Sequence, residues 1–259
     1  MKETIISSFL KQHAEAGYCH KDIVAEGTLF RGLLEQLSAQ TQNVFSIFDL
    51  KEFKYRYFTS NLYGMYGIRP QDGFDFGKAL EASRAGYEGI AVFMNLMKES
   101  LLKHSPDEVS NCNITASGMP VVNTCGVKLK LFIHTVPLCS VENDEGYPRY
   151  WLSVLQDISA FIEEGYWLRA VVADRIYHQS YGDIQVHQKE LITPSQLEIL
   201  KCWMEHGDSK AIAAQLHISD ATVRNQLVSI RGRLLARDNS AAVKLAMSCG
   251  MLSPRYKKT

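Results

Sequence analysis

Apolar residues recur three or four positions apart near the N-terminus, which is the period of an amphipathic helix and predicts two helices between residues 3 and 40. Residues 53–57 instead alternate aromatic and basic side chains, as a strand with one buried face does. Residues 77–103 return to a helical pattern. Three strand-like runs follow, at 109–117, 126–138 and 149–157. Because helices and antiparallel-looking strands do not alternate one by one, the pattern predicts an α+β layout.

The segment after these strands has no clean helical stripe. It is rich in β-branched and aromatic residues, which predicts a β-hairpin or an extended linker. The chain therefore divides into four parts. They are N-terminal helices at 1–38, a sheet domain at 39–160, a linker at 161–190 and a helical domain at 191–259.

Helix caps are clear in the last part of the chain. Thr193 and Gln196 have the spacing of a capping box, and Pro194 suits the first helical position between them. Asp208 and Ser219 are placed to cap a second and a third helix. A fourth helix is predicted over 241–247, so this domain is expected to be all-α with four helices.

The third of these helices has one apolar stripe with spacings of four, three and four residues, formed by Val223, Leu227, Ile230 and Leu234. A short helix, a tight turn and a longer helix with one buried stripe make a helix-turn-helix unit, whose second helix can enter the major groove of DNA. The opposite face of the third helix carries Arg224 and Asn225, side chains that can hydrogen-bond to guanine and adenine.

Composition alone is that of an ordinary globular protein. The 259 residues are 46% hydrophobic and 22% charged, and the formal net charge is zero. The positive and negative charges are unevenly distributed along the chain. Residues 191–259 hold ten Lys and Arg against five Asp and Glu, a net charge of +5, and the rest of the chain carries −5. The helical domain is thus the basic end of the molecule, as expected of a partner for nucleic acid.

Other chemistry finds no support in the sequence. The six cysteines have no metal-ligand spacing, so no metal site is expected, and no residue pattern predicts a flavin, a haem or another cofactor. No nucleophile elbow or glycine-rich phosphate loop occurs, so we do not expect an enzyme. The N-terminus lacks the apolar stretch of a signal peptide, and the longest apolar run, 90–97, is too short to span a membrane. We expect a cytoplasmic protein with no membrane contact.

The C-terminal motifs resemble the LuxR-type, or GerE-type, DNA-binding domain. The matching motifs are TPxxxEIL, KxIAxxLxIS, xTVRNQ and IRxRLLARDNSAAV, in register without gaps. The resemblance implies base contacts by Arg224, Asn225 and Val228. It implies phosphate contacts by Lys210, Thr222, Gln226, Ser229 and Arg233, and the charge of Arg231 suits a phosphate as well. It also implies a homodimer on double-stranded DNA, with dimer contacts from the fourth helix at Ala241, Ala242, Val243, Leu245 and Ala246.

The sheet domain resembles a PAS domain. The start, FSIFDLKEFKYRYFTSNLYGMYGI, and the ending, WLSVLQDIS, are similar to the PAS pattern, and the order of expected elements agrees. The resemblance implies an antiparallel sheet with flanking helices that senses a signal, with an unidentified small molecule as a candidate ligand. Ten aromatics lie between 45 and 76, and most are expected in the core. Five of them are the candidate ligand-pocket residues: Phe53, Tyr55, Tyr57, Tyr63 and Tyr66.

These features favour a sequence-specific transcription regulator in which the PAS-like domain controls a LuxR-type domain. One alternative is a quorum-sensing regulator of the acyl-homoserine-lactone type, although the expected Trp, Tyr and Asp signature is missing. Another is a PAS module that dimerises or binds a partner and has no small-molecule ligand.

Overall fold

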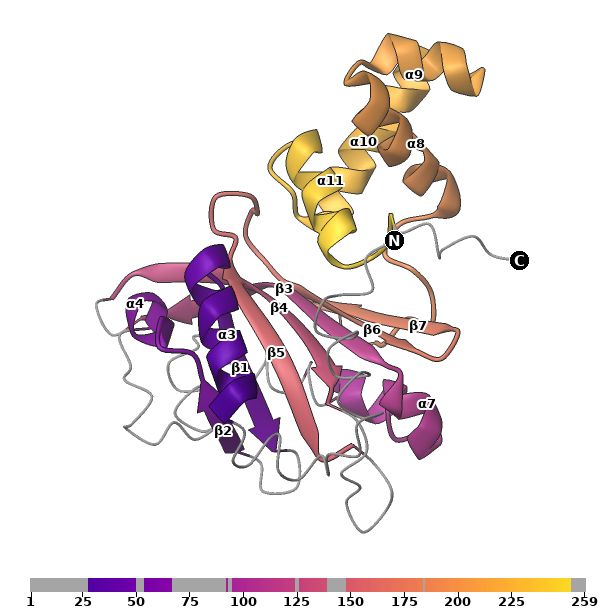
Figure 1. The fold of residues 1–259 in the computed structure, drawn as a ribbon. Coiled ribbons are helices and arrows are strands. Elements are labelled where there is room, and N and C mark those ends of the chain that lie inside the picture. Colours follow the sequence, from indigo (N-terminus) through magenta and orange to yellow (C-terminus); the bar gives the residue numbers. More distant parts are fainter. Residues whose placement is uncertain are drawn as a thin grey trace.

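The chain folds into an antiparallel sheet with flanking helices, followed by a group of C-terminal helices beside one end of the sheet (Figure 1). This computed structural model describes residues 28–49, 54–66, 92, 95–123, 126–138, 148–183 and 185–252. The sheet is antiparallel, and helices do not alternate with strands one by one, so the predicted α+β class is confirmed. None of the described helices is long and apolar enough to cross a membrane.

Over the described residues the sheet has seven strands in the order β2-β1-β5-β4-β3-β6-β7, and all neighbouring strands are antiparallel. The strands are β1 (Val44–Asp49), β2 (Lys54–Phe58), β3 (Asn113–Val122), β4 (Lys128–Pro137), β5 (Tyr150–Asp157), β6 (Trp167–Val172) and β7 (Arg175–Ser180). The first five in spatial order form the PAS-like sheet that the sequence predicts. Strand β1 pairs with both β2 and β5. The strand β5, which comes last of these five in the sequence, therefore lies at the centre of the PAS-like sheet.

The segment predicted as a β-hairpin or an extended linker contains two strands of the sheet. Strands β6 and β7 form a hairpin, whose turn contains Ala173 with a φ of 54°. Strand β6 also pairs with β3, from Asn113 opposite Val171 to Ser117 opposite Trp167. A hairpin alone would leave apolar residues of β6 in water, whereas pairing with β3 buries them and satisfies the edge of β3. The stretch 167–180 is therefore the hairpin that the sequence allowed, and it belongs to the sheet rather than to an extended linker.

The third predicted strand begins later than its pattern indicates. A short helix, α7 (Pro106–Ser110), occupies the start of the expected run at 109–117. The Ser105 hydroxyl accepts a hydrogen bond from the Glu108 N–H at 3.4 Å, and the Glu108 carboxylate accepts one from the Ser105 N–H at 2.9 Å. This capping box starts a helix locally, and the strand begins only once that turn has ended.

The two faces of the sheet are covered differently. On the outer face, helix α3 (Thr28–Thr41) packs Phe30 and Leu34 against Ile47 and Leu152. The expected helix before α3 lies outside the described residues. On the inner face, the core includes Ile114 and side chains from the helical residues 95–100 and from α7. The helix α4 (Leu62–Tyr66) follows β2. Of the helical region predicted over 77–103, the structure describes residue 92 and residues 95–103. Residues 95–100 are helical, and residues 101–103 form a turn.

Three hydroxyl side chains lie in a row on the inner face. Ser153 of β5 is opposite Ser46 of β1 and opposite Thr135 of β4. The Thr135 and Ser153 hydroxyls are hydrogen-bonded at 2.9 Å. The Ser46 hydroxyl is fully buried and has no hydrogen-bond partner among the described residues. Since a buried polar group without a partner is costly, Ser46 marks a polar position in an otherwise apolar core.

We predict that Gly118→Ala lowers the free energy of unfolding more than Gly126→Ala does. Gly118 lies at the bulge of β3 with a φ of 81°, and a Cβ atom there would lie 2.5 Å from the carbonyl oxygen of Gly165. Gly126 also has a positive φ, 78°, but an added Cβ would meet nothing within 4 Å. The control variant thus carries only left-handed strain of about 1–2 kcal/mol. Urea denaturation of both variants measures the difference, and equal losses would contradict the steric role of Gly118.

Candidate nucleic-acid interface

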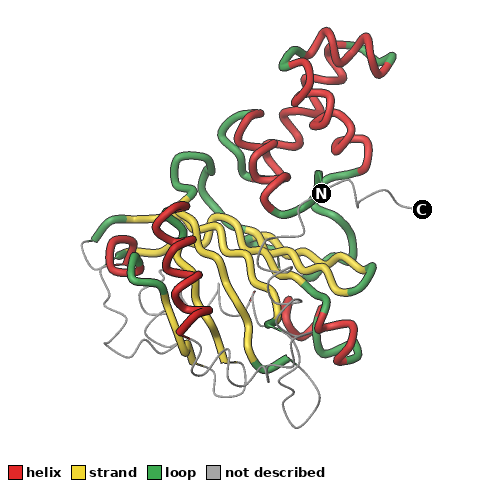
Figure 2. Tube along the Cα trace, in the orientation of Figure 1, coloured by secondary structure: helices red, strands yellow, loops and turns green. Residues whose placement is uncertain are grey.

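Four helices make up the C-terminal domain, as the sequence predicts. They are α8 (Pro194–His206), α9 (Ser209–Leu216), α10 (Asp220–Leu234) and α11 (Asn239–Ser248), which are drawn in red, as all helices are, in Figure 2. Helix α11 extends beyond the predicted 241–247 at both ends because Asp238 caps it, accepting a hydrogen bond from the Ala241 N–H at 2.7 Å.

Each predicted cap is present in the structure. The Thr193 hydroxyl accepts from the Gln196 N–H at 3.3 Å, while the Gln196 side chain accepts from the Thr193 N–H at 2.9 Å. The Asp208 carboxylate accepts from the Ala211 N–H at 3.0 Å. These caps fix where the helices begin, because the first N–H groups of a helix have no partner within it.

A tight turn joins α9 to α10. His217 ends α9 in the left-handed conformation, with a φ of 54°, and its N–H donates to the Ala213 carbonyl. Ser219 then caps α10, accepting from the Thr222 N–H at 3.0 Å. The predicted apolar stripe of α10 is buried in full, at Val223, Leu227, Ile230 and Leu234. The short helix, the turn and the longer helix thus form a helix-turn-helix unit with one buried and one open face.

The open face of α10 carries the three candidate base-reading residues. Val228 is 56% exposed, and Arg224 and Asn225 are exposed beside it. One turn earlier, Asp220 accepts a charged hydrogen bond from the Arg224 guanidinium, which lowers the pKa of the Asp220 carboxyl. This pair was not predicted, although a spacing of four residues on one helix is the signal that indicates such a pair. The pair directs the Arg224 side chain toward the start of α10.

The candidate phosphate-contacting residues differ in how many hydrogen bonds within the protein fix their side chains. Lys210 and Thr222 are exposed near the start of α10. Gln226 and Ser229 are half-buried and both accept from the buried Gln196 side chain, at 3.0 and 3.2 Å. Gln196 therefore belongs both to the cap of α8 and to the support of the α10 surface, a role that sequence spacing did not indicate.

The remaining arginines of α10 lie toward its C-terminal end. Arg231 is half-buried and Arg233 is exposed. The Arg233 guanidinium donates to the Leu191 carbonyl oxygen at 3.2 Å. Arg233 thus ties α10 to the chain that enters α8, and its other donors stay on the outside of the domain.

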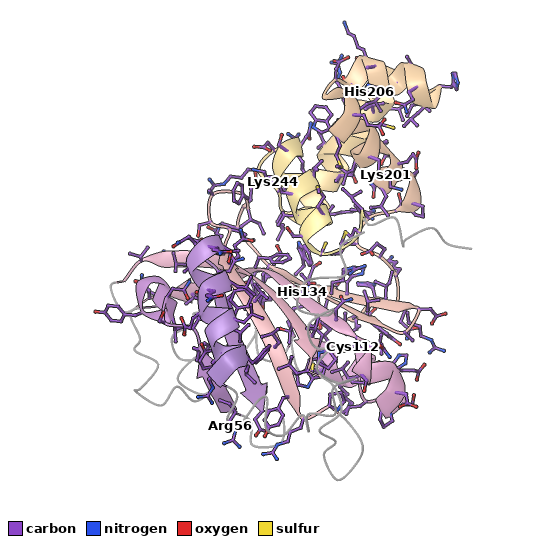
Figure 3. All side chains as sticks on the ribbon, viewed as in Figure 1. Arg56, Cys112, His134, Lys201, His206 and Lys244 are labelled. Atoms are coloured by element: carbon purple, nitrogen blue, oxygen red, sulfur yellow. The ribbon has the colours of Figure 1, made fainter. Side chains whose placement is uncertain are left out.

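Four of the five candidate dimer contacts are buried within the protomer. Ala241, Ala242, Leu245 and Ala246 belong to the core that α11 shares with α8 and α10. Their positions fall on one face of a helix, which here packs inward, so these side chains cannot also contact a second copy. Only Val243 of the five is partly exposed. The outer face of α11 carries Lys244 and Met247, of which Lys244 is marked in Figure 3.

The described candidate ligand-pocket aromatics, Tyr55, Tyr57 and Tyr63, do not converge on one site. A β-bulge in β2 turns Tyr55 and Tyr57 to opposite faces of the sheet, because Ile47 pairs with Tyr57 and Phe48 with Tyr55, which leaves Arg56 as an extra residue between them. Tyr55 packs against Phe58 in the inner core, with ring centroids 4.5 Å apart, and burial raises its pKa to about 12. Tyr57 points to the outer face, where its hydroxyl donates to Glu35 of α3 at 2.7 Å.

Of the other three candidates, Tyr63 is 54% exposed and lines no interior. Phe53 and the side chain of Tyr66 lie outside the described residues. The three described aromatics, Tyr55, Tyr57 and Tyr63, therefore do not line one pocket, and the hydroxyl row of the inner face was not predicted.

The fold and the exposed face of α10 define a helix-turn-helix DNA-binding domain. Residues 190–246 match the family model described as bacterial regulatory proteins, luxR family (GerE). This part of the chain is thus a LuxR-type domain.

Comparison with solved structures gives distant likenesses over most of the chain. The Vibrio cholerae VqmA dimer is 15% identical, covers 85% of this chain and 89% of its own, and has a TM-score of 0.32. The phage VqmA–DPO complex is 12% identical over 86% and 90%, with a TM-score of 0.33. A LOV protein of Rhodobacter sphaeroides is 11% identical over 80% and 89%, with a TM-score of 0.34. Scores this low carry no inference about function. No curated protein matches the chain by sequence.

We predict that Ser219→Ala lowers the free energy of unfolding by about 1 kcal/mol, because it removes the cap of α10. Ser240→Ala is the control, since Ser240 is exposed within α11 and is not a cap. Chemical denaturation followed by circular dichroism measures both. A loss for Ser219→Ala no larger than that for Ser240→Ala would show that the cap contributes nothing.

Proposed function

We propose that this protein is a sequence-specific transcription regulator that binds double-stranded DNA through α10. The observation that carries the proposal is the open face of α10, where Arg224, Asn225 and Val228 are exposed together on a LuxR-type helix-turn-helix unit. A helix presented in this way has the dimensions to enter the major groove.

The three side chains suit the edges of the base pairs. Arginine donates two hydrogen bonds to guanine, asparagine pairs with adenine, and an apolar side chain contacts the thymine methyl group. On α10, Arg224 and Asn225 are neighbours and Val228 follows one turn later, so all three lie along one side of the helix. We assign base reading to these residues.

Contacts with the DNA backbone would surround this face. Lys210 approaches from α9, while Thr222, Gln226 and Ser229 lie along α10 with the arginines at its C-terminal end. Gln196 already holds Gln226 and Ser229 in place, so these two would meet phosphates at little cost in side-chain entropy. The net charge of +5 in residues 191–259 adds a long-range attraction for DNA.

We further propose that the protein acts as a homodimer. Paired recognition helices read two half-sites, which is how helix-turn-helix proteins reach long sites. Because the inner face of α11 is used within the protomer, the dimer contact is assigned to the outer face, at Val243 and Met247.

The sheet domain is proposed to sense a small molecule. The supporting observation is the row of hydroxyls formed by Ser46, Ser153 and Thr135 on the inner face, with Ser46 buried and lacking a partner among the described residues. A ligand with a hydrogen-bonding group would satisfy Ser46. A thermal-shift screen of metabolites with wild type and Ser46→Ala tests this. No stabilisation by any compound would favour a module that binds a protein partner instead.

Selection of binding sites tests DNA recognition. The full chain is incubated with sheared genomic fragments, and bound fragments are enriched, sequenced and compared with random DNA in gel-shift titrations. We expect a shared motif with two half-sites and an affinity that falls steeply with salt. Enrichment of no motif would refute sequence-specific binding.

We predict that Arg224→Ala and Asn225→Ala each cost about 1–3 kcal/mol on the selected site and relax its preference at one base pair. The physical reason is the loss of hydrogen bonds to a base edge. Titrations on the selected site and on single-base variants measure the change. An equal loss on random DNA would contradict base reading and indicate a backbone contact.

We predict that Lys210→Ala weakens binding to all sequences alike. Removing one phosphate contact should reduce the slope of log K against log salt by about 1. Titrations between low and moderate salt on selected and random DNA measure this slope. Lys201→Ala is the control, since Lys201 is an exposed lysine of α8 outside the helix-turn-helix unit (Figure 3). A slope unchanged by Lys210→Ala would refute the phosphate contact.

A further inference from the structure

The DNA-binding helices pack directly against the outer face of the sheet. Figure 1 shows them beside the end formed by β3, β6 and β7. A single hydrophobic core contains Phe132, Ile158 and Trp167 from the sheet side together with the buried residues of α8, α10 and α11. The indole N–H of Trp167 donates to the Leu234 carbonyl oxygen, at the end of α10, at 3.2 Å. The recognition helix is thus anchored to the sheet at its C-terminal end.

Two short segments add backbone pairing to this contact. The Glu163 N–H donates to the Leu235 carbonyl at 2.7 Å, and the Arg237 N–H donates to the Phe161 carbonyl at 3.1 Å. Ile162 and Ala236 form an antiparallel bridge between them, and both are buried. This pairing joins the loop before β6 to the connection between α10 and α11. The position of α10 is therefore set by hydrogen bonds as well as by apolar packing.

Arg169 of β6 holds the two ends of the helical domain. Its fully buried guanidinium forms an ion pair with Glu190, with donor–acceptor distances of 2.7 to 3.1 Å. A further N–H of Arg169 donates to the Cys249 carbonyl at the end of α11, at 3.2 Å. Glu190 precedes α8 and Cys249 follows α11, so a single side chain connects β6 to both boundaries of the domain.

Strand β6 has a second buried face. Leu168 and Ala170 alternate with Trp167 and Arg169 and point to the interior of the sheet domain, where both are fully buried. The inner face of β6 thus belongs to the core that would surround a ligand, while its outer face holds the DNA-binding helices. A shift of β6 by any interior occupant would move both faces, because a strand is a rigid unit at this scale.

We propose that β6 couples the interior of the sheet domain to the orientation of α10, with Arg169 as the positioning residue. The inference rests on the proposed function for its biological meaning, since orientation matters only if α10 reads DNA. In each protomer the sheet and the DNA-binding helices form one body. A signal therefore acts by displacing β6, and not by loosening a flexible tether between the two domains.

The experiment compares two identical substitutions in the same row of the inner face. Leu168 of β6 and Leu155 of β5 are joined across the sheet by the pairs Leu168–Ala116, Ala116–Ile133 and Ile133–Leu155. Leu155→Ala removes the same side chain from β5. Leu155 packs with Val44 and Leu131 in a separate hydrophobic cluster of the inner face. Spin labels carried by keto amino acids at Arg175 of β7 and Ala214 of α9, both exposed, report the distance between the two domains in the full chain.

We expect a narrow distance distribution for wild type and Leu155→Ala and a shifted or broadened one for Leu168→Ala. The same distribution in both variants, or a broad one in wild type, would overturn the proposal. Fluorotryptophan signals of Trp151 in β5 and Trp203 in α8 verify by NMR that both domains remain folded.

Arg169→Lys keeps the test decisive if Leu168→Ala fails to fold. Lysine retains the positive charge, but one ammonium group cannot reach Glu190 and the Cys249 carbonyl in the geometry of the guanidinium fork. We expect the distribution to broaden in this variant and the affinity for the selected DNA to fall about fivefold or more. A wild-type distribution for Arg169→Lys would overturn the positioning role. The distance measurement needs no DNA. If the selection of binding sites yields no DNA motif, the proposed function is refuted, and the measured distances still test whether β6 positions α10.

Discussion

The buried guanidinium of Arg169 is the constraint on which the arrangement of the molecule depends. A charge without water needs an opposite charge and a full set of hydrogen bonds, and the loss of one partner of such a pair costs about 3–5 kcal/mol. Arg169 finds its partners only if Glu190 and the Cys249 carbonyl both lie over β6. Since these two groups bound the helical domain, satisfying one side chain of the sheet also sets the position of four helices. The apolar contact around Trp167 then excludes water from this charge.

This docking decides which surfaces stay free. The C-terminal end of α10 lies against the sheet, whereas its first three turns, with Arg224, Asn225 and Val228, remain open. The inner face of α11 is buried in the core of the protomer, so a dimer contact must use other residues. Lys244 of α11 lies over the Phe161 ring at 4.6 Å, which adds a cation–π contact at the same boundary (Figure 3). The sheet thus holds the helix-turn-helix unit without covering the exposed face of α10.

The predictable part of the site was local. The caps at Thr193, Asp208 and Ser219 and the buried stripe of α10 follow from spacings of three or four residues, which the chain itself displays. The hydrogen bonds from Gln196 to Gln226 and Ser229 join residues about thirty positions apart, and no spacing rule reaches that far. Grouping Tyr55 with Tyr57 in one pocket was wrong, because a β-bulge at Arg56 turns the two side chains to opposite faces of the sheet, and the strand period does not reveal a bulge.

The sequence by itself determined the α+β class, the helices of the C-terminal domain and the kind of DNA-binding unit, because helical period, strand period and capping are properties of short segments. Only the tertiary structure decided where the stretch 167–180 belongs. Its β-branched and aromatic residues predict a hairpin or an extended linker, and the open edge of β3 resolves the choice by pairing with β6. Likewise, Arg169 reads in the sequence as one more surface charge. It is a buried anchor because Glu190 and Cys249, 21 and 80 residues away, meet it in the folded chain.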